Sequence, residues 1–269
     1  MKQITVGDLK ICCESVGYGY PIVLIMGLTA NMDWWDPELV DALSQKYRVL
    51  MFDNRGAGRT ITPDDGEFTC EMFADDTAAL MDAKGIKRAN ILSQSMGGLI
   101  AQELALKYPE MVNNLVLGCT FCGGQHMIQA SQEVMQILMD RSGGLDGLFD
   151  RVLKLMFTKD FLDANPDFVK QFKERYLRAP ISNANALRQF MACAKSDTYE
   201  RLPEIKKPTL VATGTDDPLI PPLNSRILAE RIPGAKLIEY KGSSHGFMSQ
   251  ARDAFIKDLL DFLALNAIE

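Results

Sequence analysis

The feature that most constrains the fold is an apolar segment that ends near Ser95 and changes at once into a helical pattern. Residues 89–92 are apolar except for Asn90, the next six read Ser-Gln-Ser-Met-Gly-Gly, and residues 99–106 have helical periodicity. A serine between a strand and a helix is held in a tight, strained turn that exposes its hydroxyl at the helix N-terminus. The pattern G-x-S-x-G describes this turn, and here Ser93 replaces the first glycine. Ser95 is therefore the candidate nucleophile.

Apolar, β-branched runs alternate with helical patterns along much of the chain. The run at 21–26 is continuously apolar, which is typical of a strand buried on both faces. A β-α-β alternation implies a parallel sheet with right-handed crossovers. We expect a hairpin over 4–14, strands at 21–26, 47–52, 89–92, 114–117, 208–214 and 235–240, and helices at 37–45, 70–83, 96–108, 223–231 and 248–265.

The alternation stops at Gly118. From about 125 to 200 the pattern is helical and rich in methionine, leucine and phenylalanine, and the strand pattern then resumes at 208. We therefore predict one α/β core domain made of residues 1–120 and 201–269, interrupted by a helical insertion over 121–200. The length of 269 residues suits a single large domain of this kind.

Composition and charge narrow the classes of partner. The net charge of −6, with no basic run, argues against a nucleic-acid partner. No apolar run is long enough to cross a bilayer, and the first residues lack the apolar stretch of a signal peptide. We expect a cytoplasmic protein without a membrane partner, either a monomer or a homodimer.

The six cysteines do not form a disulfide scaffold in a chain of this size. Cys119 and Cys122 make a C-x-x-C, but two glycines follow it where a redox motif would begin a helix. A zinc site would need two further ligands at suitable spacing. We interpret these residues as buried or pocket-lining thiols and expect neither a metal nor an organic cofactor.

A serine hydroxyl needs a base, and the usual base is histidine. The chain has two histidines. His245 lies in a glycine-rich loop after a strand, so it can reach the sheet edge that carries Ser95, whereas His126 is expected at the surface or the rim of a pocket. A carboxylate must orient the base. Asp217 is our candidate, with Asp216 as the alternative, because both follow a strand.

An acyl-transfer intermediate also needs donors for its oxyanion. The Met96 amide, at the start of the helix after Ser95, is one candidate. The second is the Leu28 amide, in the loop after the strand at 21–26, where Gly27 lets the backbone approach closely. An ordinary glycine turn would give the same sequence at that loop.

In these motifs the chain resembles the α/β-hydrolase superfamily over nearly its full length. The matching motifs are Met26-Gly27 with Trp35-Asp36-Pro37-Glu38-Leu39, then residues 53–60, then residues 93–98, and finally Gly214-x-x-Asp217 with Ser244-His245-Gly246. The resemblance is to small, capped esterases and lactonases, such as 3-oxoadipate enol-lactonase and aclacinomycin methylesterase. It implies a mostly parallel eight-stranded sheet, helices on both faces, and a helical cap inserted after the sixth strand.

Two positions depart from the superfamily pattern. Members usually have histidine where Met26 stands and glycine where Ser93 stands.

Residues 53–60 are a structural turn in this superfamily and lack the third glycine of a dinucleotide loop. Related epoxide hydrolases and haloalkane dehalogenases use an aspartate nucleophile. The serine at position 95 therefore argues against those two activities for this chain.

The substrate pocket is expected between the cap and the sheet. Most apolar cap residues should simply hold the cap helices together, and the rest should line an adaptable apolar wall. We expect Gly27, Trp34, Met127 and Phe157 to contact the substrate, and Trp35 to pack against the helix that follows it. Whether any cap arginine binds an acidic substrate stays open.

The sequence thus predicts a serine hydrolase that cleaves a small to medium, largely apolar carboxylic ester or lactone through an acyl-enzyme. Its activity should fall in acid with a midpoint near about pH 6.5 to 7, as the histidine protonates. Two alternatives stay open: hydrolysis of carbon–carbon bonds or cofactor-free perhydrolysis by the same triad, and a hydrolase-fold receptor that binds a small ligand.

Overall fold

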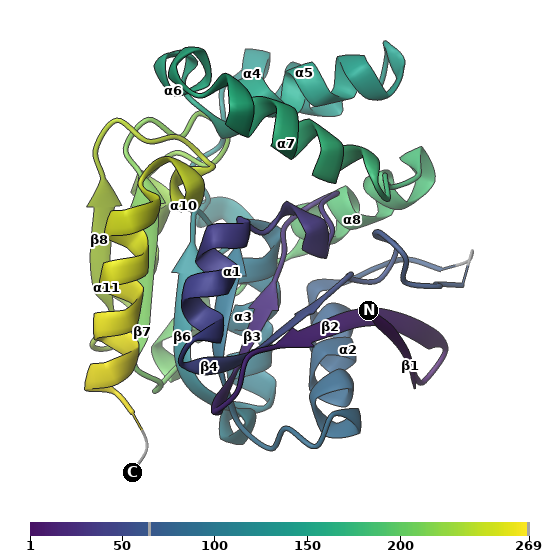
Figure 1. Cartoon of the computed structure of the whole chain (residues 1–269). Coiled ribbons are helices and arrows are strands. Elements are labelled where there is room, and N and C mark those ends of the chain that lie inside the picture. Colours follow the sequence, from purple (N-terminus) through teal and green to yellow (C-terminus); the bar gives the residue numbers. More distant parts are fainter. Residues whose placement is uncertain (64–65, 268–269) are drawn as a thin grey trace.

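The computed structural model describes residues 1–63 and 66–267, and its centre is a twisted sheet (Figure 1). Among these residues eight strands pair in the order β1-β2-β4-β3-β5-β6-β7-β8. β1 and β2 form the predicted hairpin, β2 also pairs antiparallel with β4, and the later neighbours run parallel. The strands are β1 (Lys2–Val6), β2 (Leu9–Val16), β3 (Tyr20–Ile25), β4 (Tyr47–Phe52), β5 (Ala89–Gln94), β6 (Val112–Gly118), β7 (Thr209–Gly214) and β8 (Lys236–Tyr240).

Helices cover both faces of the sheet, so the parallel strands are buried from two sides (Figure 1). One apolar layer lies under α1 (Pro37–Ser44) and α11 (Arg252–Leu265). The opposite layer lies under α2 (Cys70–Ala83), α3 (Met96–Lys107) and α9 (Leu223–Arg231). The predicted α/β fold class is confirmed by this architecture.

Local sequence explains where these helices begin. Asp36 caps α1 by accepting a hydrogen bond from the Glu38 amide, and Pro37 follows at the first helical position. Thr69 caps α2 in the same way by accepting from the Met72 amide. These caps set the first residue of each helix, and the predicted starts at 37 and 70 agree with the structure.

The last predicted helix is divided in two, which corrects the expectation of one helix over 248–265. A short α10 (Phe247–Gln250) precedes α11, and Ala251 between them leaves the helical conformation at φ −107° and ψ 33°. The Gln250 side chain accepts from the Ser244 amide and donates to Thr158 Oγ1 in the cap. These bonds hold α10 beside the His245 loop, while α11 packs against the sheet.

The helical insertion lies over the carboxyl ends of the strands (Figure 1). It comprises α4 (Gln132–Met139), α5 (Gly144–Met156), α6 (Lys159–Ala164), α7 (Pro166–Leu177) and α8 (Asn183–Lys195). The two chain segments that join it to the core lie side by side: the Gly124 amide donates to Ser196 O, and the Thr198 amide donates to Cys122 O. Gly123 has a φ of 75°, and a Cβ there would stand 1.9 Å from Ser196 O. Only glycine fits this close approach.

The interior of this cap is an aromatic cluster. Phe149, Phe157, Phe172 and Tyr176 are its buried members, and Trp34 of the core packs against them. This cluster holds α5, α6 and α7 of the cap together. No helix in the described part of the chain combines the length and apolar character needed to span a membrane.

Candidate active site

Ser95 lies between β5 and α3 in a strained backbone conformation. Its φ is 56° and its ψ is −122°, a region that residues with a side chain rarely occupy. Its amide donates to Gly118 O at 2.9 Å, and its carbonyl accepts from Thr120 Oγ1 at 2.7 Å. Ser95 is only half-buried between fully buried neighbours, so its side chain faces the space under the cap.

Close packing explains the small residues that follow Ser95. A Cβ at Gly97 would stand 2.1 Å from Ile25 O, and one at Gly98 would stand 2.4 Å from the Thr120 side chain. Ser93, at the position where glycine is usual, is fully buried and donates its hydroxyl to Val116 O at 2.7 Å. The extra polar group of Ser93 is therefore satisfied, and the turn keeps its shape.

The structure brings His245 and Asp217 together. Nδ1 of His245 lies 2.7 Å from Oδ2 of Asp217, and both side chains are buried. The other carboxylate oxygen of Asp217 accepts from the Leu219 and Ile220 amides, each at 2.9 Å. Because the carboxylate is held by backbone donors, it fixes the orientation of the imidazole and leaves Nε2 for other partners.

Asp216, the alternative carboxylate, points elsewhere. Its side chain is exposed and accepts a hydrogen bond from the Thr215 hydroxyl at 2.7 Å. In this structure Asp217 is the carboxylate that contacts the histidine. The catalytic role assigned to it remains a prediction.

Burial alone lowers the pKa of His245, but the negative charge and hydrogen bond of Asp217 outweigh burial and raise the pKa above 6.5. Cys119 adds to the raised pKa: its Sγ lies 3.9 Å from Nε2 of His245, and its thiol donates to His245 O at 3.3 Å. The acid limb of activity is therefore expected at a higher pH than an unperturbed histidine would give.

The candidate oxyanion loop runs against the nucleophile. A Cβ at Gly27 would lie 3.0 Å from Cβ of Ser95, so the absence of a side chain permits this approach. Leu28 and Met96 line the same cavity as Ser95. Met96 begins α3, so its amide has no partner within the helix. These positions are compatible with two backbone donors facing an oxyanion.

Two residues outside the predicted set hold this loop. Asn54 donates through Nδ2 to Met26 O at 2.8 Å. The Thr29 amide, at a residue with φ 63°, donates to Oε1 of Gln189 in α8 at 2.9 Å. Gln189 also donates through Nε2 to Arg55 O at 2.9 Å and is fully buried. The cap thus contacts the backbone of the candidate oxyanion loop directly.

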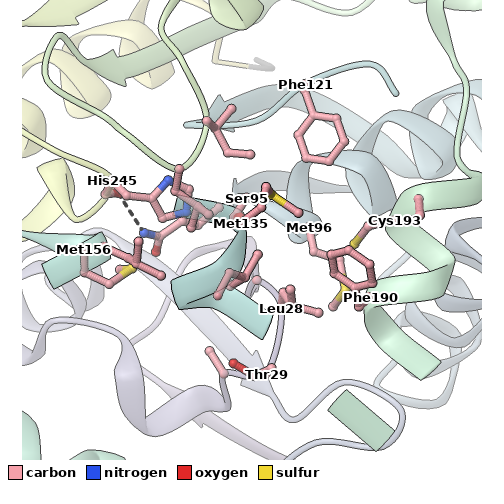
Figure 2. Close-up of a pocket in the computed structure, with 18 of the residues that line it drawn as sticks. Leu28, Thr29, Ser95, Met96, Phe121, Met135, Met156, Phe190, Cys193 and His245 are labelled. Atoms are coloured by element: carbon pink, nitrogen blue, oxygen red, sulfur yellow. Dashed lines mark hydrogen bonds between the residues drawn. The ribbon is translucent and has the colours of Figure 1, made fainter. Parts of the chain in front are cut away.

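Ser95 and His245 line one cavity of about 230 Å³ between the sheet and the cap (Figure 2). Gly27, Trp34 and Met127, three of the predicted substrate-binding residues, line it as well. The other lining residues are mostly apolar and include Met26, Phe121, Met135, Leu138, Val152, Leu155, Met156, Phe190, Cys193, Leu219 and Ile220. In the described chain, no lysine, arginine, aspartate or glutamate lines this cavity.

Phe157 is the exception among the predicted substrate-binding residues. It belongs to the aromatic cluster of the cap, with its ring centroid 5.1 Å from Phe168 and 5.6 Å from Phe172. Its neighbour Met156 lines the cavity instead. The turn at the end of α5 directs these consecutive side chains apart, and a count of apolar residues cannot show which one faces inward.

The contacts that two further residues make with His245 were not predicted from the sequence. Gln94 donates through Nε2 to His245 O at 3.3 Å and lines the cavity. Cys119 has a φ of 38° at the end of β6 and contacts the same histidine. Gln94 adjoins Ser95 and Cys119 follows a strand, so their placement at the sheet edge was a usable signal. Both cysteines of the C-x-x-C are buried free thiols.

His126 lies away from the base position. Its ring stacks on Tyr199 with centroids 3.5 Å apart, as a half-buried residue near the base of the cap.

Among the described residues, ligand atoms of Cys119, Asp217 and His245 lie within 4.8 Å of one another. Hydrogen bonds to His245 and to two backbone amides already engage the Asp217 carboxylate, so we interpret this group as a hydrogen-bonded base rather than a metal site.

Similar proteins are found among curated sequences and among solved structures. Among curated proteins, a protein named carbamate hydrolase RutD from Azorhizobium caulinodans is 30% identical over 95% of this chain and 96% of its own length. A protein named non-heme bromoperoxidase BpoC from Mycobacterium tuberculosis is also 30% identical, over 95% of this chain and 98% of its own.

Among solved structures, the enol-lactonase from Burkholderia xenovorans LB400 superimposes with a TM-score of 0.85 at 30% identity, over 97% of this chain and 99% of that one. The family profile described as the alpha/beta hydrolase fold matches residues 20–250. That match spans the sheet edge, the cap and the His245 loop. The chain therefore belongs to the α/β-hydrolase fold family, and it is a hydrolase of that family.

Proposed function

We propose that this hydrolase cleaves an uncharged carboxylic ester or lactone through an acyl-enzyme on Ser95. The observation that carries the proposal is a strained serine at the start of α3 that shares an apolar cavity with a histidine held by Asp217. A strained turn, an oriented base and a helix N-terminus are the parts that acyl transfer requires.

In the proposed reaction, Nε2 of His245 accepts the proton of Ser95 as the serine oxygen attacks the substrate carbonyl carbon. The amides of Leu28 and Met96 stabilise the resulting oxyanion. The carbon–oxygen bond to the leaving group then breaks, and His245 returns the proton to the leaving oxygen. Water, deprotonated by His245, attacks the acyl-enzyme, and the acid is released as Ser95 recovers its proton.

The cavity lining supports an uncharged substrate. Its residues are largely apolar, and the described chain places no cationic side chain along it. A carboxylate on the substrate would lose its hydration there without gaining a charged partner, which is costly in a buried site. We therefore favour neutral esters and lactones over substrates that carry an acidic group.

The first prediction concerns Ser95. Ser95→Ala should lower kcat/KM for p-nitrophenyl butyrate by at least about a thousandfold, because the acyl-enzyme cannot form. A fluorophosphonate should add its mass to the wild-type protein and leave the variant unmodified. Ser44→Ala, at the end of α1, is the matched control and should keep wild-type rates. Equal turnover by wild type and Ser95→Ala would refute the proposal.

Perhydrolysis is a second candidate, favoured by the 30% identity to the protein named bromoperoxidase BpoC. In that reaction hydrogen peroxide replaces water as the nucleophile that attacks the acyl-enzyme, and a peracid leaves. An assay of peracetic acid from acetate and peroxide separates the two functions. Ester hydrolysis without peracid formation supports the first proposal alone.

A further inference from the structure

A second cavity lies beside the catalytic one, inside the cap. It has a volume of about 320 Å³ and is lined by residues of α4, α5 and α8. We call it the outer cavity. The residues that line both cavities are Leu28, Thr29, Leu138, Val152, Leu155 and Phe190. The two spaces therefore meet at one common wall, which is mostly apolar.

The outer cavity is apolar and reaches the surface. Ile137, Leu148 and Ala186 line only this cavity, and so do Met139 and Leu187, which are 43% and 53% exposed. Large apolar side chains that face an unfilled hollow favour an apolar ligand, because a ligand chain would remove them from water. An aliphatic chain supplies such surface without polar groups.

Charged residues stand at the rim of the outer cavity, and each has a partner within the cap. Arg151 pairs with Asp140 at 3.2 Å and donates to Ser142 O. Arg141 donates to Asn183 Oδ1 at 3.0 Å. Asp140 offsets the charge of Arg151, but Asn183 is neutral and leaves the charge of Arg141 at the rim, so the preference for a neutral chain rests on the apolar lining and not on the rim.

The position of the common wall indicates which part of a substrate enters. In Figure 2, His245 lies on one side of Ser95, while Leu28, Phe190 and Cys193 lie on the other. The leaving group must accept a proton from His245 and so departs on the histidine side. The acyl chain then extends in the opposite direction, past Leu28 towards Phe190.

We infer that the outer cavity is the subsite for the distal part of a long, unbranched, uncharged acyl chain, with Phe190 at its threshold. This inference rests on the proposed esterase function and names its substrate class: carboxylic esters or lactones with an aliphatic acyl chain that passes beyond the catalytic cavity. Short acyl chains fill only the cavity next to Ser95.

The test uses the full-length protein and p-nitrophenyl esters of increasing acyl length: acetate, butyrate, octanoate and dodecanoate. We expect kcat/KM for octanoate to exceed that for butyrate by about tenfold or more, because buried methylenes contribute to transition-state binding. An octanoate analogue with a terminal carboxylate should lose this gain. Equal rates for butyrate and octanoate in the wild type would overturn the inference.

Ala186→Trp places an indole in the outer cavity only. It should lower kcat/KM for octanoate by about tenfold and leave butyrate unchanged. Ala164→Trp, an exposed position at the end of α6 outside both cavities, is the matched control and should change neither rate. Unchanged butyrate hydrolysis shows that the variant is folded, and Ala186→Met replaces it if the tryptophan prevents folding.

The outcomes separate the two proposals. Absence of ester hydrolysis in the wild type, or hydrolysis that survives Ser95→Ala, refutes the proposed function of an acyl-enzyme on Ser95. Hydrolysis that depends on Ser95 but shows no octanoate preference, or an Ala186→Trp variant that keeps the preference, refutes the outer subsite alone. Loss of the octanoate preference in Ala186→Trp, with butyrate hydrolysis intact, supports both.

Discussion

The hydrogen bond between His245 and Asp217 determines which ring nitrogen is available to Ser95. Nδ1 is engaged with the carboxylate at 2.7 Å, which favours the neutral tautomer with its proton on that nitrogen and leaves Nε2, 3.9 Å from Cys119 Sγ, as the acceptor. At the level of single residues, the proposed chemistry depends on this one contact.

Asp217→Asn tests that dependence. The amide removes the negative charge that raises the pKa of His245 and permits the wrong tautomer, so kcat/KM should fall by roughly a thousandfold or more. Wild-type activity is lost as the pH falls through the raised pKa of His245, above about 6.5. In the variant that midpoint should move to lower pH, because burial then acts without the opposing charge.

A pH profile of ester hydrolysis from pH 4 to 9 measures both effects. Asp216→Asn is the control, since its exposed carboxylate bonds to Thr215 and not to the histidine. If Asp216→Asn and Asp217→Asn shifted the midpoint equally, the assigned partner would be wrong.

Single residues also show how far a sequence can be interpreted. The pattern around Ser95 predicted its turn because strand, small residues and helix are contiguous. The choice between Asp216 and Asp217 depended on which of two neighbouring side chains turns inward, and the backbone donors of Leu219 and Ile220 decide that. The position of Cys119 after a strand places it at the same sheet edge as His245, but the contact itself spans 126 residues and could not be inferred from spacing.

Among the elements, α8 of the cap makes the most direct contact with the candidate oxyanion loop. Gln189 accepts from the Thr29 amide and donates to Arg55 O, which joins the loop after β3 to the segment after β4. The bond to Thr29 spans 160 residues of sequence. No helical periodicity could have predicted it, although periodicity did indicate helices in this region.

Gln189→Met should therefore weaken catalysis. The substitution leaves the half-buried Thr29 amide without its acceptor, at a cost of up to about 1–3 kcal/mol. We expect kcat for a short ester to fall by about tenfold with little change in KM, since the loop contributes mainly to the oxyanion. Gln136→Met, on the exposed face of α4, is the matched control. An unchanged kcat in Gln189→Met would show that the loop holds its shape without the cap.

Across the whole molecule, cap and core share a continuous interior. Met127, Ala192 and Cys193 of the insertion pack into the apolar layer beneath α2 and α3. Trp34 of the core packs against Phe172 and Tyr176 of the cap, with ring centroids 5.4 Å and 5.2 Å apart. We expect the two parts to unfold together.

The two tryptophans provide the measurement, because they are the only ones in the chain. Trp35→Phe leaves Trp34 as a reporter at the cap–core contact, and Trp34→Phe leaves Trp35 as a reporter in the layer beneath α1. Fluorescence in each variant should change at the same denaturant concentration as its own far-ultraviolet circular dichroism. A Trp34 transition that precedes the loss of circular dichroism would show that the cap detaches first.

For the whole molecule, the sequence predicted the sheet and its helical layers, but it did not predict which residues of the insertion face the cavity. The alternation of strands and helices predicted the sheet and its layers, because the core is built from contiguous elements. Which cap residues face the cavity depends on how α4 to α8 pack on one another, and the misplaced Phe157 illustrates this.

The end of α5 also reaches the base. Met156 O accepts from the Gly246 amide at 2.6 Å, and a Cβ at Gly246 would lie 2.3 Å from the Phe157 ring. Together with Gln189, this contact connects the cap to both the proton acceptor and the oxyanion loop. If the entire cap lifted to exchange ligands, the position of His245 and the shape of the candidate oxyanion loop would both be disturbed. A passage between α4, α5 and α8 would let molecules come and go while the catalytic geometry stays assembled.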